Sequence, residues 1–214
     1  DAHSGAAVCT PTRYGVLTGR YPSRIGQFGV LTTFSKPIIP ATRMTVAAML
    51  KQNGYTTACI GKWHLGGPAT YPEKHGFDEN IAGTDKAQPP SYHAPYNIPT
   101  LKPEGKEGEY LTDRLGDEAA RFIERHQARP FFLYLPHNSI HAPIRAPPEL
   151  VAKHRARSGS GRPENNAVIA AMMAAARSSR YFSFVPKSRW VRARRPSVFL
   201  SGIVLCVLMK VLEK

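Results

Sequence analysis

The chain has 214 residues, with 29 Lys and Arg against 15 Asp and Glu, and a formal net charge of +14. That length leaves room for one or at most two domains with a sizeable core. Hydrophobic residues make up 42% and aromatic residues 9% of the chain. These fractions exclude a chain that is disordered as a whole, because so much apolar surface offsets the chain entropy.

The positive charge is concentrated in the last third of the chain. Residues 1–152 hold 16 Lys and Arg and 13 Asp and Glu, net +3, whereas residues 153–214 hold 13 and 2, net +11. Clustered Lys and Arg are typical of proteins that bind nucleic acid or anionic membranes, because binding releases counterions. The nearly balanced first part does not favour either partner, so that interpretation applies to the tail alone.

Cysteine usage and the beginning of the chain say little about the compartment. Cys9, Cys59 and Cys206 are too few and too scattered for a disulfide framework or a structural zinc site. The chain begins at Asp1 and shows no charged-then-apolar leader, so no signal peptide is predicted within it.

The first predicted element is a short helix over residues 11–17. Thr10 suits the N-cap, and Pro11 suits the first helical position, where its missing N–H costs nothing. Cys9 is then expected just before the helix N-terminus, with Arg13 one turn further on. Such an electropositive position lowers the pKa of a thiol and can hold an anion on free backbone N–H groups.

A helix, a strand and a polar loop follow in this order. Thr45 is predicted to cap a helix that ends at Gly54, a residue suited to the left-handed conformation after a helix. Residues 55–60 then form a predicted strand, and residues 61–66, Gly-Lys-Trp-His-Leu-Gly, form the loop that leaves it.

The same order returns further along the chain. Thr112 is predicted to cap a helix, and Pro130 is predicted to close the turn after it. Residues 131–135 then form a predicted, near-continuous apolar strand, and residues 136–143 form the polar loop that leaves it. One stripe of that helix is apolar, at Leu115, Ala119, Phe122 and Ile123. The repeated order predicts an α/β fold with a mainly parallel sheet, in which ligands gather beyond the carboxyl ends of the strands.

The remaining segments have weaker signals. Residues 83–109 are rich in Pro, Gly and Tyr without a period, which predicts a long surface excursion near the mouth of the site. Residues 165–176 are predicted as a helix, whereas residues 177–196 are basic without a clear period. The apolar run 198–209 is shorter than the ~20 residues of a membrane helix, so we predict a buried strand or helix piece, with membrane contact as the alternative.

Three motifs, in order, resemble the signatures of one family. Cys-Thr-Pro-Thr-Arg at 9–13, followed by Leu-Thr-Gly-Arg at 17–20, is similar to the formylglycine signature of the type I sulfatases. Residues 54–66 resemble the second signature of that family, and His-Ala-Pro at 141–143 resembles a third element. Two further stretches also look like bacterial arylsulfatase-type members, Gly76-Phe77-Asp78 and Gly108-Glu109-Tyr110-Leu111-Thr112-Asp113. The resemblance implies an alkaline-phosphatase-like α/β sandwich on a large mixed, mainly parallel sheet, here incomplete at both ends.

The resemblance also implies the roles of five residues. A formylglycine-generating enzyme would oxidise Cys9 to formylglycine, whose hydrated aldehyde is the nucleophile and can expel sulfate by elimination, whereas a serine sulfate ester would need a second attack. Arg13 would hold the gem-diol, and Lys62 would contact the sulfate and neutralise charge on its oxygens. His64 would orient or deprotonate the nucleophile, and His141 would bind the substrate's leaving oxygen or protonate it.

Other side chains are given structural interpretations. Cys59 and Trp63 are expected to pack rather than react, and His137 is the histidine that competes with His141. Four histidines without a surrounding motif are expected on the surface or in helices: His75, His93, His126 and His154.

The family further implies a divalent cation, usually Ca²⁺, on oxygen ligands. Those ligands are a carboxylate pair on an early strand, an Asp-Asn pair on a later one, and the formylglycine itself, so Cys9 is the one implied metal ligand present. The chain contains neither an Asp-Asp nor an Asp-Asn pair. We expect the first pair upstream of Asp1. We expect the second pair to be lost after residue 173, where a partial catalytic domain at 1–173 gives way to a basic, family-unlike tail at 174–214. A wrong reading frame or a retained intron would explain that tail. On that expectation the chain alone is inactive.

The leading prediction is therefore a sulfuric ester hydrolase that acts on sulfated carbohydrates or aryl sulfates, periplasmic or extracellular by family analogy. Two alternatives stay open. One is phosphonate or phosphate ester hydrolysis within the same superfamily, and the other is a non-enzymatic basic protein that binds through residues 153–214.

Overall fold

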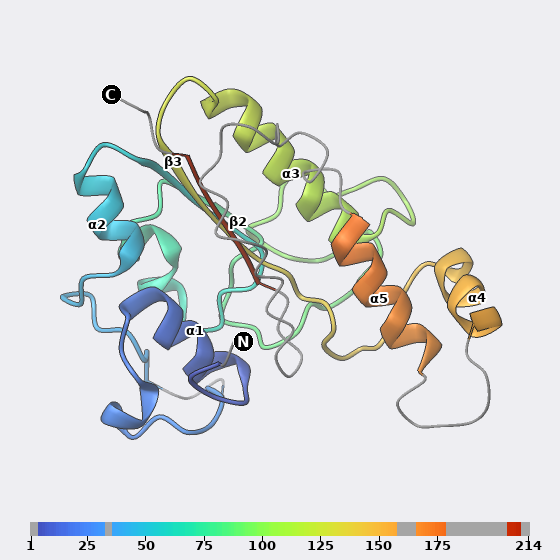
Figure 1. Ribbon diagram of the computed structural model, residues 1–214, viewed down its shortest axis with the longest axis horizontal. Helices are drawn as coiled ribbons and strands as arrows, with labels where there is room; N and C mark the ends of the chain where they lie inside the picture. The colour runs from blue at the N-terminus through green and yellow to red at the C-terminus, as the bar shows by residue number, and fades with distance from the viewer. Residues whose placement is uncertain (1–3, 33–35, 158–165, 179–204, 211–214) are drawn as a thin grey trace.

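The computed structural model describes residues 4–32, 36–157, 166–178 and 205–210, and Figure 1 shows their arrangement. The helices longer than one turn are α1 (Cys9–Thr18), α2 (Val46–Gln52), α3 (Leu111–His126), α4 (Pro148–Arg157) and α5 (Ala167–Ser178). Three short 3₁₀ helices are η1 (Pro22–Ile25), η2 (Pro68–Thr70) and η3 (Pro72–His75). The strands are β1 (Thr56–Ile60), β2 (Glu79–Ile81), β3 (Phe131–Pro136) and β4 (Leu205–Lys210).

The four strands form one sheet in the order β2-β1-β3-β4. Strand β1 is parallel to both β2 and β3, with Cys59 opposite Asn80 on one side and Tyr134 on the other. Strand β4 is antiparallel to β3. The predicted α/β fold with a mainly parallel sheet is confirmed, and the antiparallel edge makes the sheet mixed.

Helices cover both faces of this sheet, and the alternation along the strands decides which side chains they meet. Ala58, Ile60 and Leu133 pack on one face with the apolar stripe of α3, while Cys59 and Tyr134 pack on the other with residues of α1 and α2. Figure 1 shows α3 on one side of the strands and α1 and α2 on the other. Because successive side chains of a strand point to opposite faces, strands buried on both faces are apolar almost throughout.

The predicted caps have different outcomes. Thr45 caps α2 as predicted, since its hydroxyl accepts from the N–H of Ala48 at 3.1 Å, and Gly54 follows the helix with φ +82°. Helix α1, in contrast, begins at Cys9 with Val8 at the N-cap, so Thr10 is not a cap and Cys9 is the first residue of the helix. Likewise, α3 begins at Leu111 after Tyr110, which places Thr112 inside the helix.

The two misassigned threonines have tertiary partners instead of helix N–H groups. The Thr10 hydroxyl donates to the carbonyl of His64 at 3.3 Å and accepts from the N–H of Leu31 at 3.1 Å. The Thr112 hydroxyl shares a hydrogen bond of 2.9 Å with that of Ser139. Both hydroxyls therefore connect a helix to a loop that is distant in the sequence.

The segment 83–109 contains neither helix nor strand, as its composition indicates, and it lies only partly on the surface, because exposed residues alternate with buried ones along it. Tyr92, Tyr96, Ile98 and Leu101 are buried in the core beside α3. Their backbone is paired as well, for example from the N–H of Leu111 to the carbonyl of Tyr92 at 2.8 Å. The prediction of a surface excursion is thus only partly right, because irregular backbone can still bury apolar side chains when its polar groups find partners.

The C-terminal predictions are confirmed in part. Residues 167–178 form α5, as predicted for 165–176, and the apolar run contributes β4. No helix in the described ranges is long and apolar enough to cross a membrane. Most of the basic stretch at 177–196 lies outside the described residues, and the division of the chain at residue 173 stays a prediction.

Candidate active site

The five predicted site residues come from three elements that meet at one edge of the sheet. Helix α1 supplies Cys9 and Arg13, and the loop after β1 supplies Lys62 and His64. The loop after β3 supplies His141. Because β1 and β3 are parallel neighbours, the loops that leave their carboxyl ends lie together, where ligands of open α/β sheets bind.

Cys9 lies against His64 in a strongly basic environment. Its Sγ is 3.3 Å from His64 Nδ1, and only 8% of the residue is exposed. Burial alone would raise the pKa of the thiol, but the His64 hydrogen bond and the charges of Lys62, His64 and Arg13 outweigh it and lower the pKa to about 6. Position 9 is thus built to hold an ionised nucleophile near neutral pH.

The hydrogen bonds of His64 determine which ring nitrogen faces Cys9 as a base. Nε2 lies 3.0 Å from the carbonyl oxygen of Leu31, which can only accept, so Nε2 carries the proton in the neutral ring. In the neutral ring Nδ1 therefore carries the lone pair, which can accept the proton of the Cys9 thiol, whereas in the imidazolium form Nδ1–H donates to the thiolate. The backbone of His64 is left-handed, with φ 53°, and its N–H donates to the carbonyl of Thr84 at 2.9 Å.

Arg13 and Lys62 are two buried cations beside this pair. Arg13, 2% exposed, donates from Nη1 to the carbonyl of Lys62 at 2.8 Å and to the Tyr134 hydroxyl at 3.4 Å. Lys62 is 4% exposed, and burial together with Arg13 lowers its pKa to about 8, although Cys9 acts in the opposite direction. Two adjacent buried cations create a strong requirement for an anion.

His141 lies within reach of the same charges. Burial, followed by the charges of Lys62, His64 and Arg13, lowers the pKa of His141. His137 is buried, and burial lowers its pKa to about 4. The structure therefore brings His141 into the group of basic residues that was predicted.

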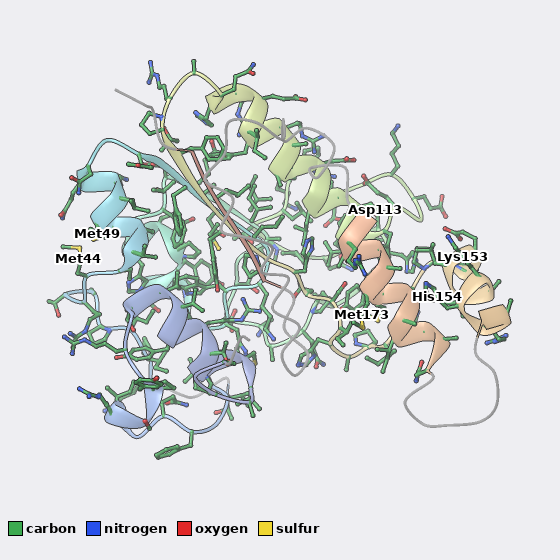
Figure 2. The ribbon with its side chains drawn as sticks, viewed as in Figure 1. Met44, Met49, Asp113, Lys153, His154 and Met173 are labelled. Atoms are coloured by element: carbon green, nitrogen blue, oxygen red, sulfur yellow. The ribbon has the colours of Figure 1, made fainter. Side chains whose placement is uncertain are left out.

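The other singled-out side chains are structural. Cys59 is fully buried, which raises the pKa of its thiol, and the indole N–H of Trp63 donates to the carbonyl of Thr70 at 2.9 Å. His126 on α3 lies 3.3 Å from Glu79, and His154 lies on α4, at the far side of the molecule from Met44 and Met49 (Figure 2).

His75 lies in a helix, one of the two kinds of position predicted for it, but it is not on the surface. It ends η3 and is buried, with its ring stacked on that of Trp63 at a centroid distance of 5.6 Å. His93, also without a motif, packs its ring 5.3 Å from Tyr110. The difference arises because an aromatic partner contributed from elsewhere in the fold can bury an imidazole that no local pattern marks as apolar.

Sequence reasoning missed three groups that hold the site together. The carbonyl of Leu31 orients His64, the hydroxyl of Tyr134 supports Arg13, and the hydroxyl of Tyr92 contacts the loop that carries His141. A tyrosine within an otherwise apolar strand, such as Tyr134 in β3, is the one signal that could have indicated a polar partner.

The described residues near Cys9 do not fit a Ca²⁺ site. Calcium takes six to eight oxygen ligands, roughly, several of them carboxylates. The charged neighbours of Cys9 are all basic, namely His64, Lys62 and Arg13. Within the ranges that the structure describes, no group of three or more His, Cys, Asp or Glu side chains could hold a metal ion.

The fold and the site define an α/β protein with a cysteine among buried basic side chains beyond the carboxyl ends of its parallel strands. The chain belongs to the sulfatase family, whose model, described as Sulfatase, matches residues 1–187. The family predicted from the motifs is thereby confirmed.

Individual relatives agree. The arylsulfatase of Hemicentrotus pulcherrimus is 35% identical over 168 residues, covering 67% of this chain and 30% of that protein. The N-acetylgalactosamine-6-sulfatase of Canis lupus familiaris is 33% identical over 189 residues, covering 73% of this chain and 35% of the relative. The chain thus spans about a third of the length of these curated relatives.

Solved structures confirm the alkaline-phosphatase-like fold. Ps i-CgsB, solved in complex with k-i-k-neocarrahexaose, superposes with a TM-score of 0.65 at 31% identity, covering 82% of this chain and 43% of that chain.

Proposed function

We propose that the protein hydrolyses sulfate monoesters with a nucleophile at position 9, formed by conversion of Cys9 to formylglycine. The observation that carries the proposal is the contact of 3.3 Å between Cys9 Sγ and His64 Nδ1, beside the buried cations Lys62 and Arg13. A base at hydrogen-bond reach of the nucleophile, next to charges that attract an anion, is the arrangement that nucleophilic attack on a sulfate ester requires.

Formylglycine, when present, supplies a hydrated aldehyde as nucleophile and a way to release sulfate without a second attack by water. The side chain at position 9 fits this conversion, because its sulfur already lies where an oxygen would meet His64 Nδ1. His64 would take the nucleophile's proton on Nδ1 while Leu31 holds Nε2–H. Arg13 would keep the loop of Lys62 in place through its bond to the Lys62 carbonyl.

The remaining two residues act on the substrate. The Lys62 ammonium would bind the sulfate oxygens and neutralise the charge that develops on them. His141 would donate a proton to the leaving oxygen, which requires the imidazolium form. Because the pKa of His141 lies below its ordinary value, we expect turnover to fall as the pH rises through that lowered pKa.

The proposed substrates are sulfated carbohydrates or aryl sulfates. The two relatives are an arylsulfatase and an N-acetylgalactosamine-6-sulfatase, and Ps i-CgsB was solved with a carbohydrate. We further propose a formylglycine-generating enzyme as the maturation partner and a periplasmic or extracellular location. The described residues do not fit a Ca²⁺ site, and the proposed roles of the five residues do not depend on one.

The first test addresses the modification. Co-expression of the chain with a formylglycine-generating enzyme is expected to change the mass of the peptide that bears Cys9 by loss of one sulfur and two hydrogens and gain of one oxygen, as the CH2–SH group becomes an aldehyde. Cys59, buried in the core, serves as the internal control and should stay unmodified. A thiol at position 9 under all conditions would contradict the proposal.

The second test addresses binding and hydrolysis. The full-length parent of this chain, modified at position 9, is titrated with inorganic sulfate by calorimetry and assayed with p-nitrophenyl sulfate and phenylphosphonate. Lys62→Gln should abolish sulfate binding, whereas Lys51→Gln, on the surface beside Asp78, should leave it unchanged. No observation favours the phosphonate alternative, and a strong preference for phenylphosphonate would replace sulfate as the substrate.

A further inference from the structure

The loop that carries His141 is held by a tyrosine from a distant segment. Tyr92 is fully buried, and its hydroxyl donates to the carbonyl of Asn138 at 2.6 Å. The same oxygen lies 3.1 Å from the carbonyl of His141 and accepts from its N–H at 3.4 Å. One phenolic hydroxyl thus joins both ends of the turn from Asn138 to His141.

Two residues at the start of α3 hold the same loop. The Tyr110 hydroxyl donates to the carbonyl of Arg145 at 3.0 Å, beyond His141, and Thr112 bonds to the hydroxyl of Ser139, before it. The rings of Tyr92 and Tyr110 are stacked at a centroid distance of 6.0 Å. Tyr110 and Thr112 belong to the stretch Gly108–Asp113, a family-like motif to which the proposed mechanism assigns no role.

Among the residues that the structure describes, the one hydrogen-bond contact of the His141 ring is within its own segment. Its Nδ1 lies 3.3 Å from the carbonyl of the next residue, Ala142, a contact that moves with the loop. The backbone hydrogen bonds at residues 138–145 therefore decide whether the imidazole stays beside Lys62, His64 and Arg13.

We propose that Tyr92, supported by Tyr110 and Thr112, is a positioning residue that holds His141 at the reaction centre. The inference deepens the proposed function and rests on it for the role of His141. The placement of His141 by Tyr92 is nevertheless measurable in the absence of turnover.

The first experiment measures placement in the 214-residue chain. The pKa of His141 is followed by NMR through its Cε1–H signal, assigned with His141→Gln, in the wild type, Tyr92→Phe and Tyr71→Phe. The wild-type pKa should lie below the ordinary value, because burial and the charges of Lys62, His64 and Arg13 lower it. In Tyr92→Phe the pKa should rise toward the ordinary 6.5 as the ring leaves these charges.

Tyr71→Phe is the matched control, since it loses a hydroxyl that contacts Asp85 at 3.3 Å and not the His141 loop. The proposal is overturned if Tyr92→Phe leaves the pKa of His141 unchanged or if Tyr71→Phe shifts it equally. Should Tyr92→Phe fail to fold, Thr112→Val, which removes the bond to Ser139, is expected to shift the pKa in the same direction, and an unchanged pKa there overturns the proposal.

The second experiment measures proton donation in the modified enzyme. Tyr92→Phe should reduce kcat for phenyl sulfate on the order of tenfold more than for p-nitrophenyl sulfate, because the poorer leaving group depends more on a placed acid. Equal losses with both substrates would overturn the positioning role. If no variant hydrolyses either ester while the NMR shifts occur, the proposed function fails and the placement by Tyr92 stands.

Discussion

Cys9 and Lys62 influence each other's protonation, because both are buried and face one another. The thiolate form of Cys9 is favoured by Lys62, and the ammonium form of Lys62 is favoured by Cys9. Burial opposes both charges, and the outcome is a thiol with a pKa of about 6 and an amine with a pKa of about 8. Each charge is therefore maintained mainly by its neighbours rather than by water.

We predict that Lys62→Gln raises the pKa of Cys9 in the unmodified chain, since the substitution removes a positive charge that stabilises the thiolate. The rate of alkylation by iodoacetamide, followed against pH by peptide mass spectrometry, measures this pKa. Alkylation of the wild type should lose half its rate at a pH of about 6, and that of Lys62→Gln at a higher pH.

Lys51→Gln is the control, because Lys51 is half exposed and pairs with Asp78 at 2.6 Å. An identical pH profile in Lys62→Gln and the wild type would show that the ammonium does not reach the thiol.

At the scale of elements, Gly61 decides how closely the end of β1 approaches the end of β3. It has φ +122°, and a Cβ there would collide with the carbonyl group of Pro136. The next residue, Lys62, donates its N–H to that same carbonyl at 2.8 Å. The close approach thus places the Lys62 and His141 loops side by side.

We predict that Gly61→Ala lowers the free energy of unfolding by roughly 3 kcal/mol or more, from positive-φ strain together with overpacking. Gly54→Ala is the matched comparison: Gly54 has φ +82°, but nothing lies near its missing Cβ. Its loss should be about 1 kcal/mol, from strain alone. Urea unfolding at neutral pH distinguishes the two, and equal losses would contradict the collision with Pro136.

Features that depend on residues near one another in the sequence could be predicted, whereas features that depend on partners far away in the sequence could not. Thr45 caps its helix because the N–H of Ala48 is a near neighbour in sequence. Thr10 and Thr112 have the same chemistry but bond to His64 and Ser139, which no local pattern reveals. The same reason explains why segment 83–109 was placed on the surface although its tyrosines complete the core.

At the scale of the whole molecule, the site makes folding depend on pH. In the folded chain the pKa of Cys9 is about 6 against an ordinary 9.0, and that of Lys62 is about 8 against 10.5. At a pH between the folded and the ordinary pKa of either group, the unfolded chain binds more protons than the folded chain. The free energy of unfolding therefore rises with pH in these ranges. For Cys9 this contribution is complete above pH 9.0 and is lost as the pH falls to about 6.

We predict that Cys9→Ser reduces the rise in the free energy of unfolding between pH 6 and pH 9, because serine does not titrate there. Urea unfolding across this range measures the rise. Cys59→Ala, in the core, should lower stability by a similar amount at every pH, since burial raises the pKa of Cys59 out of the range. A rise in Cys9→Ser equal to that of the wild type would contradict the prediction.

The sequence by itself determined the family, the helix–strand–loop units that contain β1 and β3, and the five residues that meet at the site. These depend on patterns that are contiguous in the chain: Cys-Thr-Pro-Thr-Arg at 9–13, Lys-Trp-His at 62–64, and apolar runs bounded by caps and glycines. Only the tertiary structure decided which nitrogen of His64 faces Cys9, that the charges of Lys62, His64 and Arg13 act on His141, and that the hydroxyl of Tyr92 contacts the loop that carries His141. Such choices depend on hydrogen bonds and charges between segments brought together by the parallel pairing of β1 and β3, which no stretch of sequence contains.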